Sequence, residues 1–195
     1  MEIQKIALFC GSSSGNGNKY TQLAHQFGLE CGKRKISLIY GGARIGLMNA
    51  AAVAAQSEGG EVIGIAPRFF DGVEVLASDL NEMILVDSMS DRKQLMEQMA
   101  DAFVILPGSF GTMDEFFEIL TDAQLGLHNK PICLLNAYDY YTPLIAQLEI
   151  FKTEGFLRSF HFDLMVQASE VEEVFMKLAN YQYCNNRNWL EKIKN

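Results

Sequence analysis

The sequence AFVILPGSFGTMDEFFEIL, residues 102–120, decides the fold of this chain. Its first five residues are apolar and predict a short buried strand, and the residues from Phe116 onward predict a helix. The turn between them, Pro107–Glu115, is rich in glycine. Glycines let a backbone approach a phosphate closely, and the free N–H groups and dipole of a helix N-terminus favour negative charge. We therefore expect this turn to bind a phosphate, with the carboxylate of Glu115 close to whatever the phosphate carries.

Two more glycine-rich turns stand in the same setting nearer the N-terminus. The strand pattern Ser37–Tyr40 precedes the turn Gly41–Gly46, and the strand pattern Ile6–Cys10 precedes the turn Gly11–Gly17. A helical pattern follows each of these turns. One such turn is a weak signal, but the loops at the carboxyl ends of parallel strands meet at one edge of a sheet. Three turns of this kind therefore predict a single ligand site.

The rest of the chain continues the alternation of short apolar runs and helical patterns. Strands separated by helices imply right-handed crossovers, so we expect an α/β fold with a doubly wound, Rossmann-like parallel sheet. We expect a single domain over residues 1–180, a polar C-terminal tail over 181–195, and an irregular segment, a candidate flap, over 67–81. Further strands are expected at 61–66, 83–86, 131–135 and 163–166, and further helices at 90–100, 141–154 and 170–178, with the helix after Thr112 ending near Leu125.

Composition and charge narrow the classes of protein. A net charge of −8 over 195 residues argues against a nucleic-acid-binding surface, which needs clustered Lys and Arg. No apolar run reaches the roughly 18 residues that a membrane span requires. The chain begins directly with strand residues, so we expect no signal peptide. The four cysteines and three histidines are scattered, which predicts no metal site and a reducing, cytoplasmic location.

Several short motifs occur in order along residues 5–178. They are Phe9–Ser13, Tyr40–Ala43 with Gly46–Met48, the pair Arg92–Lys93 followed by Met96, Pro107–Glu115, and Gln124–Pro131. Together they resemble the motifs of the "Lonely Guy" (LOG) family, cytokinin riboside 5'-monophosphate phosphoribohydrolases, whose bacterial members often carry the label lysine decarboxylase. The chain departs from the family pattern where Ser109 and Ala43 replace glycines and where Ser90-Asp91 precedes the Arg-Lys pair. A serine is tolerated in the phosphate turn if its φ is negative.

The resemblance implies an enzyme that hydrolyses the N-glycosidic bond of a nucleoside 5'-monophosphate, with adenine or an N6-modified adenine as the base. It also implies a homodimer, and we expect no cofactor. Glu115 and Arg92 would be the catalytic pair. The residues expected to bind substrate come from the phosphate turn and from the loops around it. They are Gly108, Ser109, Phe110, Gly111, Thr112, Lys93, Ser12, Ser13, Gly42, Met48 and Met96.

Simpler structural roles stay open for several of these residues. Thr112 and Glu115 fit a capping box, in which the threonine is the N-cap and the glutamate reaches back to its N–H. Arg92 is compatible with a solvated position on the first turn of its helix. Met48 and Met96 are compatible with a hydrophobic core. In addition, Ser12 and Ser13 fit a turn as well as they fit contacts to a ribose or base.

Two classes of function therefore remain in competition. One is the N-glycosyl hydrolase, and the other is a non-catalytic protein that binds a nucleotide or a nucleotide-linked cofactor. The combination of Arg92 and Glu115 favours the enzyme, because phosphate binding alone has no use for a carboxylate beside the ligand. A pyridoxal phosphate decarboxylase is disfavoured because no lysine stands in a suitable setting. A dinucleotide dehydrogenase is disfavoured because Gly11–Gly17 lacks the G-x-G-x-x-G order.

Overall fold

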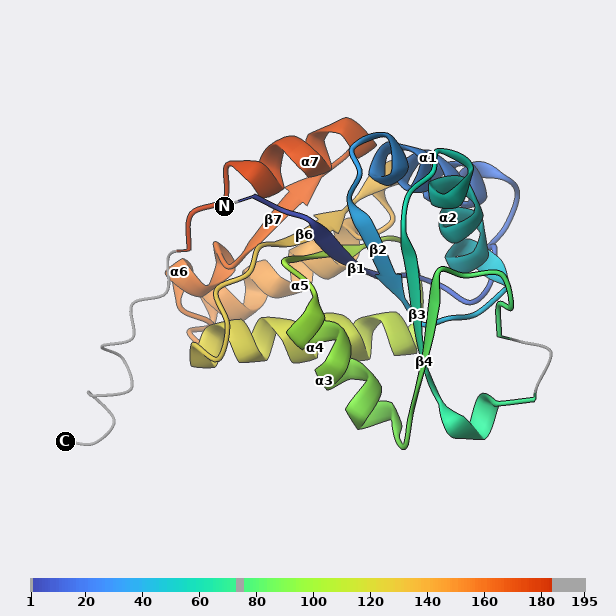
Figure 1. The fold of residues 1–195 in the computed structure, drawn as a ribbon. Helices are drawn as coiled ribbons and strands as arrows, with labels where there is room; N and C mark the ends of the chain where they lie inside the picture. The colour runs from blue at the N-terminus through green and yellow to red at the C-terminus, as the bar shows by residue number, and fades with distance from the viewer. Residues whose placement is uncertain (1, 73–75, 184–195) are drawn as a thin grey trace.

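The computed structural model describes residues 2–72 and 76–183, and in them seven strands form one parallel sheet (Figure 1). The strand order is β4-β3-β2-β1-β5-β6-β7. This order confirms the predicted doubly wound α/β fold. The strands are β1 (Lys5–Phe9), β2 (Ser37–Tyr40), β3 (Val62–Pro67), β4 (Glu82–Val86), β5 (Ala102–Ile105), β6 (Ile132–Leu135) and β7 (Met165–Ala168).

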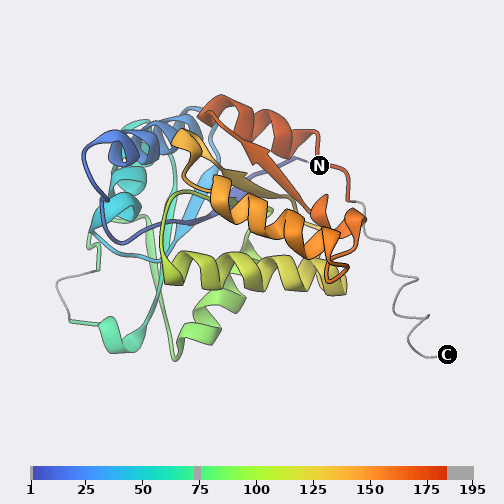
Figure 2. The ribbon, with the colours of Figure 1, turned by 180° about the vertical axis from the view of Figure 1, so that it is seen from behind.

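Helices cover both faces of the sheet. Helices α1, α2 and α7 pack on one face, whereas α3, α4 and α5 lie on the other, as Figures 1 and 2 show from opposite sides. None of the helices in the described part of the chain is long and apolar enough to cross a bilayer. The helices are α1 (Lys19–Lys33), α2 (Gly46–Ser57), α3 (Met89–Met99), α4 (Phe110–Leu125), α5 (Thr142–Thr153), α6 (Ser159–Phe162) and α7 (Val171–Ala179).

The two-sided covering explains why the strands are apolar throughout. Along β1, Ile6 and Leu8 belong to the core cluster beneath α1, α2 and α7, whereas Ala7 and Phe9 belong to the cluster on the opposite face. Successive side chains of a strand point to opposite faces, so a strand buried on both sides has no polar alternation. The continuous apolar runs in the sequence follow from this geometry.

The last strand begins two residues later than its apolar pattern predicts. It was expected over 163–166, but β7 spans Met165–Ala168. Asp163 instead follows the short helix α6 as its C-cap, and Gln167 pairs with Leu134 of β6. Because Gln167 is polar, the apolar pattern stops before the strand does. A helix as short as α6 also leaves no strong signal in the sequence.

The segment expected to be irregular contains two local contacts. A 3-10 helix spans Arg68–Phe70, and Leu76 forms an isolated antiparallel bridge with Ala43. Residues 73–75, which belong to the same candidate flap, lie outside the described residues. The predicted tail at 181–195 is described only as far as Tyr183, whose hydroxyl donates to the carbonyl of Ala123 at 3.1 Å.

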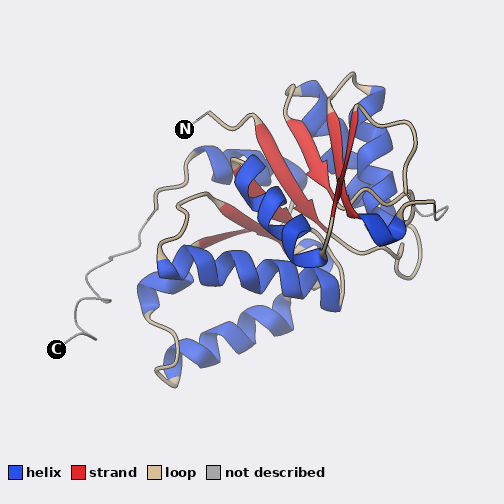
Figure 3. Cartoon of the chain, turned by 60° about the horizontal axis from the view of Figure 1, so that its bottom comes forward, coloured by secondary structure: helices blue, strands red, loops and turns tan. Residues whose placement is uncertain are grey.

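The strand order changes direction between β1 and β5. From β1 the chain moves outward through β2, β3 and β4, and it then returns to add β5 on the other side of β1. The loops that leave these two strands diverge to opposite faces of the sheet, which opens a crevice beyond their carboxyl ends. Figure 3 shows the strands between their helical layers. The fold thus brings the three glycine-rich turns to one edge of the sheet.

Candidate active site

Gly11 joins the three glycine-rich turns. Its N–H donates to the carbonyl of Pro107 at 3.0 Å, and its own carbonyl accepts a hydrogen bond from the N–H of Leu47 at 3.1 Å. Gly46, with a φ of +62°, packs so closely that a Cβ there would lie 2.3 Å from the backbone carbon of Ser12. A glycine is therefore required at position 46, and the three turns form one connected structure.

A cavity of about 370 Å³ lies between these turns. Its polar side chains are those of Ser12, Arg92, Ser109, Thr112 and Glu115. Apolar side chains complete the lining, and they come mainly from the second turn, the Arg68–Phe70 helix and the start of α3. They include Ile45, Met48, Phe70, Leu76 and Met89. A cavity with a few convergent polar groups and an apolar remainder is typical of a small-molecule site.

The turn after β5 leads directly into helix α4. The helix begins at Phe110, with Ser109 as its N-cap, so Thr112 is the third helical residue. The N–H groups of the first turn of a helix have no partner within the helix. Ser109 has a φ of −119°, a value open to any residue, and the serine fits the turn where the family pattern has glycine. Gly108 is required here, because a Cβ would lie 2.1 Å from Oγ1 of Thr112.

The capping-box interpretation of Thr112 and Glu115 is wrong. Thr112 is not the N-cap, and the carboxylate of Glu115 accepts a hydrogen bond from the guanidinium of Arg92. This ion pair joins α3 to α4 across 23 positions of the sequence. The side chains of Arg92 and Glu115 are only 12% and 10% exposed, so Arg92 is not a solvated surface residue.

Burial raises the pKa of the Glu115 carboxyl to about 7, although the positive charge of Arg92 opposes the rise. The nearby charge of Asp114 raises it further. The carboxyl therefore takes up a proton more readily than an ordinary glutamate does. A raised pKa of this kind suits general acid–base chemistry, which needs a group that exchanges a proton near the working pH.

Gly41 makes room for this ion pair, a role that the sequence interpretation missed. A Cβ at Gly41 would lie 3.2 Å from Nη1 of Arg92 and 3.3 Å from the sulfur of Met48. The neighbouring Gly42 was expected to bind substrate, but it does not line the cavity. It has a φ of +73° and shapes the turn. The consecutive glycines after Tyr40 were the available signal, and they do not indicate which of the two faces the ligand.

Five of the predicted substrate-binding residues line the cavity. They are Ser12, Met48, Ser109, Gly111 and Thr112. Gly108 does not line the cavity but leaves room for the side chain of Thr112. Ser13 stabilises its own loop, since its hydroxyl accepts the N–H of Gly15 at 3.3 Å. The side chain of Phe110 is 93% exposed and is not part of the lining.

Met96 and Lys93 do not contribute to the cavity. Met96 lies one helical turn after Arg92. It is completely buried in the core cluster between the sheet and helices α3 and α4. Lys93 forms ion pairs with Asp114 at 2.9 Å and with Glu118, and it thereby connects the outer surfaces of α3 and α4. The structure therefore gives no support to the expectation that these two residues bind substrate.

The other reactive groups near the cavity do not offer a second chemistry. Cys10 lines it, but burial strongly raises the pKa of its thiol, so the thiol does not ionise near neutral pH. A thiol that stays protonated is a poor nucleophile. Within residues 2–72 and 76–183, no group of three or more His, Cys, Asp or Glu side chains is arranged to hold a metal ion.

The chain is similar in sequence to a set of named enzymes. The family model described as "Possible lysine decarboxylase" matches residues 48–178. A cytokinin riboside 5'-monophosphate phosphoribohydrolase of Rhodococcoides fascians is 46% identical over 155 residues, which are 79% of this chain and 78% of that protein. An enzyme of the same name from Arabidopsis thaliana is 38% identical over 186 residues, 95% of this chain and 86% of that protein.

Solved structures of lower sequence similarity share the fold. The molybdenum cofactor binding protein of Rippkaea orientalis superposes with a TM-score of 0.69 at 20% identity, covering 92% of this chain and 97% of that one. The molybdenum cofactor carrier protein of Chlamydomonas reinhardtii gives 0.68 at 17% identity, covering 92% and 98%. At this identity the likeness extends to the fold alone. The sequence relatives are far closer, and the chain belongs to the LOG family of cytokinin riboside 5'-monophosphate phosphoribohydrolases.

Proposed function

We propose that this protein hydrolyses the N-glycosidic bond of a purine nucleoside 5'-monophosphate and releases the free base and ribose 5-phosphate. The names of its family relatives support this class of reaction. The observation that carries the proposal is the buried ion pair of Arg92 and Glu115, which faces the same cavity as the N-terminus of α4. Adenine and N6-prenylated adenine are the two candidate bases.

The phosphate would bind at the start of α4. The free N–H groups of the first helical turn and the helix dipole both favour an anion at this position. Ser109, Gly111 and Thr112 border the cavity there, and Glu115 lies one turn further along the same helix. A phosphate fixed at this end would hold the ribose beside the carboxylate, and such positioning lowers a barrier by as much as about 7–11 kcal/mol in the best cases.

Glu115 would act on the anomeric carbon and on the attacking water. Cleavage develops positive charge on the ribose, and an ionised carboxylate stabilises that charge, as in sugar hydrolysis. The water oxygen forms the new bond to the anomeric carbon and gives its proton to Glu115. The electron pair of the broken C–N bond goes to the base, which takes up a proton from solvent.

Arg92 would orient Glu115 and meet the substrate. Its hydrogen bond fixes one carboxylate oxygen, and guanidinium geometry suits a fixed contact of this kind. The Nε of Arg92 is buried without a hydrogen-bond partner among the described residues. A buried donor without an acceptor is costly, so an oxygen of the bound ribose or phosphate would satisfy it.

The apolar part of the cavity would hold the base. Ile45, Met48 and Met89 are part of its apolar lining. Thioether and branched aliphatic side chains pack against the face of a planar ring without demanding hydrogen bonds. The base would therefore lie between the second glycine turn and the start of α3, with its glycosidic bond directed at Glu115.

A product assay tests the proposal. AMP, isopentenyladenosine monophosphate and adenosine are incubated separately with the protein, and the free base is measured by chromatography. We expect base release from at least one of the monophosphates and much less from adenosine, because adenosine lacks the phosphate that positions the ribose. Equal turnover of adenosine and AMP would contradict the role assigned to the start of α4.

The competing function is binding of a nucleotide or nucleotide-linked cofactor without catalysis. Two structural neighbours are named as molybdenum cofactor proteins, but their 17–20% identity extends to the fold alone. A carboxyl with a pKa near 7 beside the ligand supports the enzyme instead. Retention of bound nucleotide with no base released from either monophosphate would favour the binding protein.

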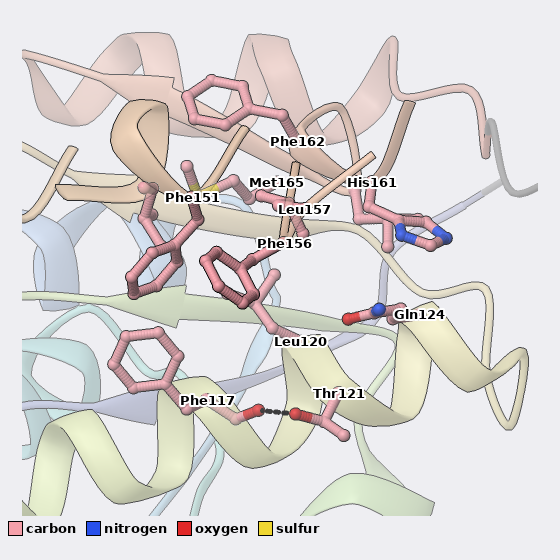
Figure 4. Close-up of a pocket in the computed structure, with 12 residues that line it drawn as sticks. Phe117, Leu120, Thr121, Gln124, Phe151, Phe156, Leu157, His161, Phe162 and Met165 are labelled. Atoms are coloured by element: carbon pink, nitrogen blue, oxygen red, sulfur yellow. Dashed lines mark hydrogen bonds between the residues drawn. The ribbon is translucent and has the colours of Figure 1, made fainter. Parts of the chain in front are cut away.

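A homodimer belongs to the same proposal. An apolar groove of about 230 Å³ lies between α4, α5 and α6. Figure 4 shows the rings of Phe117, Phe151 and Phe156 in this groove. Phe156 is 86% exposed and Phe117 38%, whereas the neighbouring Phe116 is fully buried. Exposed aromatic surface of this kind is suited to a second copy of the chain.

A cytoplasmic location is also part of the proposal. Cys10, Cys31 and Cys133 are buried as free thiols in the described part of the chain. Free thiols without disulfides are typical of a reducing compartment.

A further inference from the structure

Two tyrosines of the segment after β6, Tyr140 and Tyr141, form hydrogen bonds to the turn between β5 and α4. The hydroxyl of Tyr140 donates to the carbonyl of Gly108 at 2.6 Å, and the hydroxyl of Tyr141 donates to the carbonyl of Leu106 at 2.7 Å. Neither tyrosine lines the cavity. Both therefore act on the turn from outside the cavity.

These bonds complete a pattern along the turn. The carbonyl of Pro107 accepts the N–H of Gly11 at 3.0 Å, and the carbonyl of Ser109 accepts the N–H of Met113 at 2.9 Å. Four consecutive carbonyls, from Leu106 to Ser109, thus each have a donor. Carbonyl oxygens carry partial negative charge and repel a phosphate, whereas N–H groups attract it. With these carbonyls engaged elsewhere, the N–H groups at the start of α4 are left to meet the ligand.

The bond from Tyr140 has the most direct effect on the ligand side. A trans peptide is planar, so its C=O and N–H point in opposite directions. The carbonyl of Gly108 is held toward Tyr140, and the N–H of the same peptide, which belongs to Ser109, is therefore turned the other way. Ser109 borders the cavity. We propose that Tyr140 is a positioning residue, and that its hydroxyl fixes this peptide so that the N–H of Ser109 meets the substrate phosphate.

The tyrosine segment is itself held in an uncommon conformation. Tyr138 and Asp139 have φ values of 57° and 56°, in the left-handed region that side chains other than glycine rarely adopt. Such residues persist where surrounding contacts over-determine them. Asn136 connects the two ends of the segment, because its side chain accepts the N–H of Tyr141 at 2.6 Å and donates to Oγ1 of Thr142 at 3.1 Å.

The ring of Tyr140 is anchored independently of its hydroxyl. Its centroid lies 5.5 Å from that of Tyr20 and 4.8 Å from that of Tyr141, both in edge-to-face arrangements. Phenylalanine at this position keeps the ring contacts and removes only the hydrogen bond. Tyr138 offers a matched control in the same segment, because no acceptor for its hydroxyl is found among the described residues and it is 55% exposed.

The inference rests on the proposed function only in taking the ligand to be a ribose 5-phosphate group. It is tested by titrating wild type, Tyr140→Phe and Tyr138→Phe with ribose 5-phosphate in a calorimeter. Loss of one hydrogen bond that orders the turn should weaken binding by about three- to tenfold in Tyr140→Phe and leave Tyr138→Phe unchanged. With AMP as substrate, KM should rise by the same factor and kcat should change little, because the phosphate is bound equally in the ground and transition states.

The outcomes separate this inference from the proposed function. Wild-type affinity for ribose 5-phosphate in Tyr140→Phe overturns the positioning role, and so does an equal loss in Tyr138→Phe or a wild-type protein that does not bind ribose 5-phosphate. A protein that binds ribose 5-phosphate but releases no base refutes the hydrolase, while the comparison of the two variants still decides the role of Tyr140.

Discussion

Arg92 and Glu115 form an ion pair that is almost completely buried, yet both side chains border a cavity of about 370 Å³. The sequence places them 23 positions apart, one on the first turn of α3 and the other on α4. A buried charge is retained only where it is paired and hydrogen-bonded. The pair therefore depends on the packing of α3 against α4, and that packing is where the first predictions apply.

Glu115→Gln should abolish base release and leave nucleotide binding within about tenfold of wild type. Glutamine keeps the shape of the side chain but neither stabilises positive charge on the ribose nor accepts a proton from water. Base release is measured by chromatography with saturating AMP or isopentenyladenosine monophosphate, and nucleotide binding by calorimetry. Turnover at the wild-type rate in this variant would reduce Glu115 to a structural residue.

Arg92→Ala should lose far more activity than Lys93→Ala, and the loss should be roughly 100-fold or more in kcat. Arg92 contacts Glu115 directly, whereas Lys93 is engaged by Asp114 and Glu118 outside the cavity. Because the loss of Arg92 leaves Glu115 poorly oriented, kcat should fall more than KM rises. Steady-state kinetics on both variants measures this, and a greater loss in Lys93→Ala would reverse the assignment.

The pH dependence of kcat/KM should reflect the pKa of Glu115. The carboxyl must be ionised to accept a proton, so activity should rise with pH and level off above a midpoint near 7. Asp114→Asn removes a negative charge that raises this pKa, and its midpoint should therefore lie at lower pH. Rates measured across the pH range in both proteins check this. A wild-type midpoint near 4.5, the ordinary value for a glutamate, would contradict the effect of burial.

The protein should be a dimer in solution, with α4 in the contact. Light scattering at micromolar concentration should give about twice the chain mass of 21.8 kDa. Phe156→Asp should convert it to a monomer, because this exposed ring lines the apolar groove. Val53→Asp on α2 is the matched control, since Val53 is also exposed but lies on the other face of the sheet. Dimers that persist in Phe156→Asp would place the contact elsewhere.

The sequence predicts the fold well because the strands are buried on both faces. Each strand is a short apolar run, and each of the three turns at the crevice carries the glycines that its geometry demands, such as Gly46 and Gly108. Glu115 could be placed beside the phosphate turn because only one helical turn separates them. Local spacing is sufficient for these conclusions.

Contacts between distant segments could not be predicted in the same way. Met96 was expected to bind substrate because it belongs to the motif that contains Arg92, with a core position left open. The structure places it in the core. The pairing of Lys93 with Asp114, and the bond from Tyr140 to Gly108 across 32 positions, depend on how whole helices and loops pack. A pattern within one segment of the sequence does not show which residues of another segment it will contact.

The position of Gly11 has a consequence for how the two ends of a ligand are recognised. Its N–H is bonded to the phosphate turn and its carbonyl to the start of α2, so neither loop can shift without the other. A nucleotide would contact the turn before α4 with its phosphate and the region at the start of α2 with its base. Ribose 5-phosphate and free adenine would then bind with positive cooperativity, and by thermodynamic linkage each would raise the affinity for the other by the same factor.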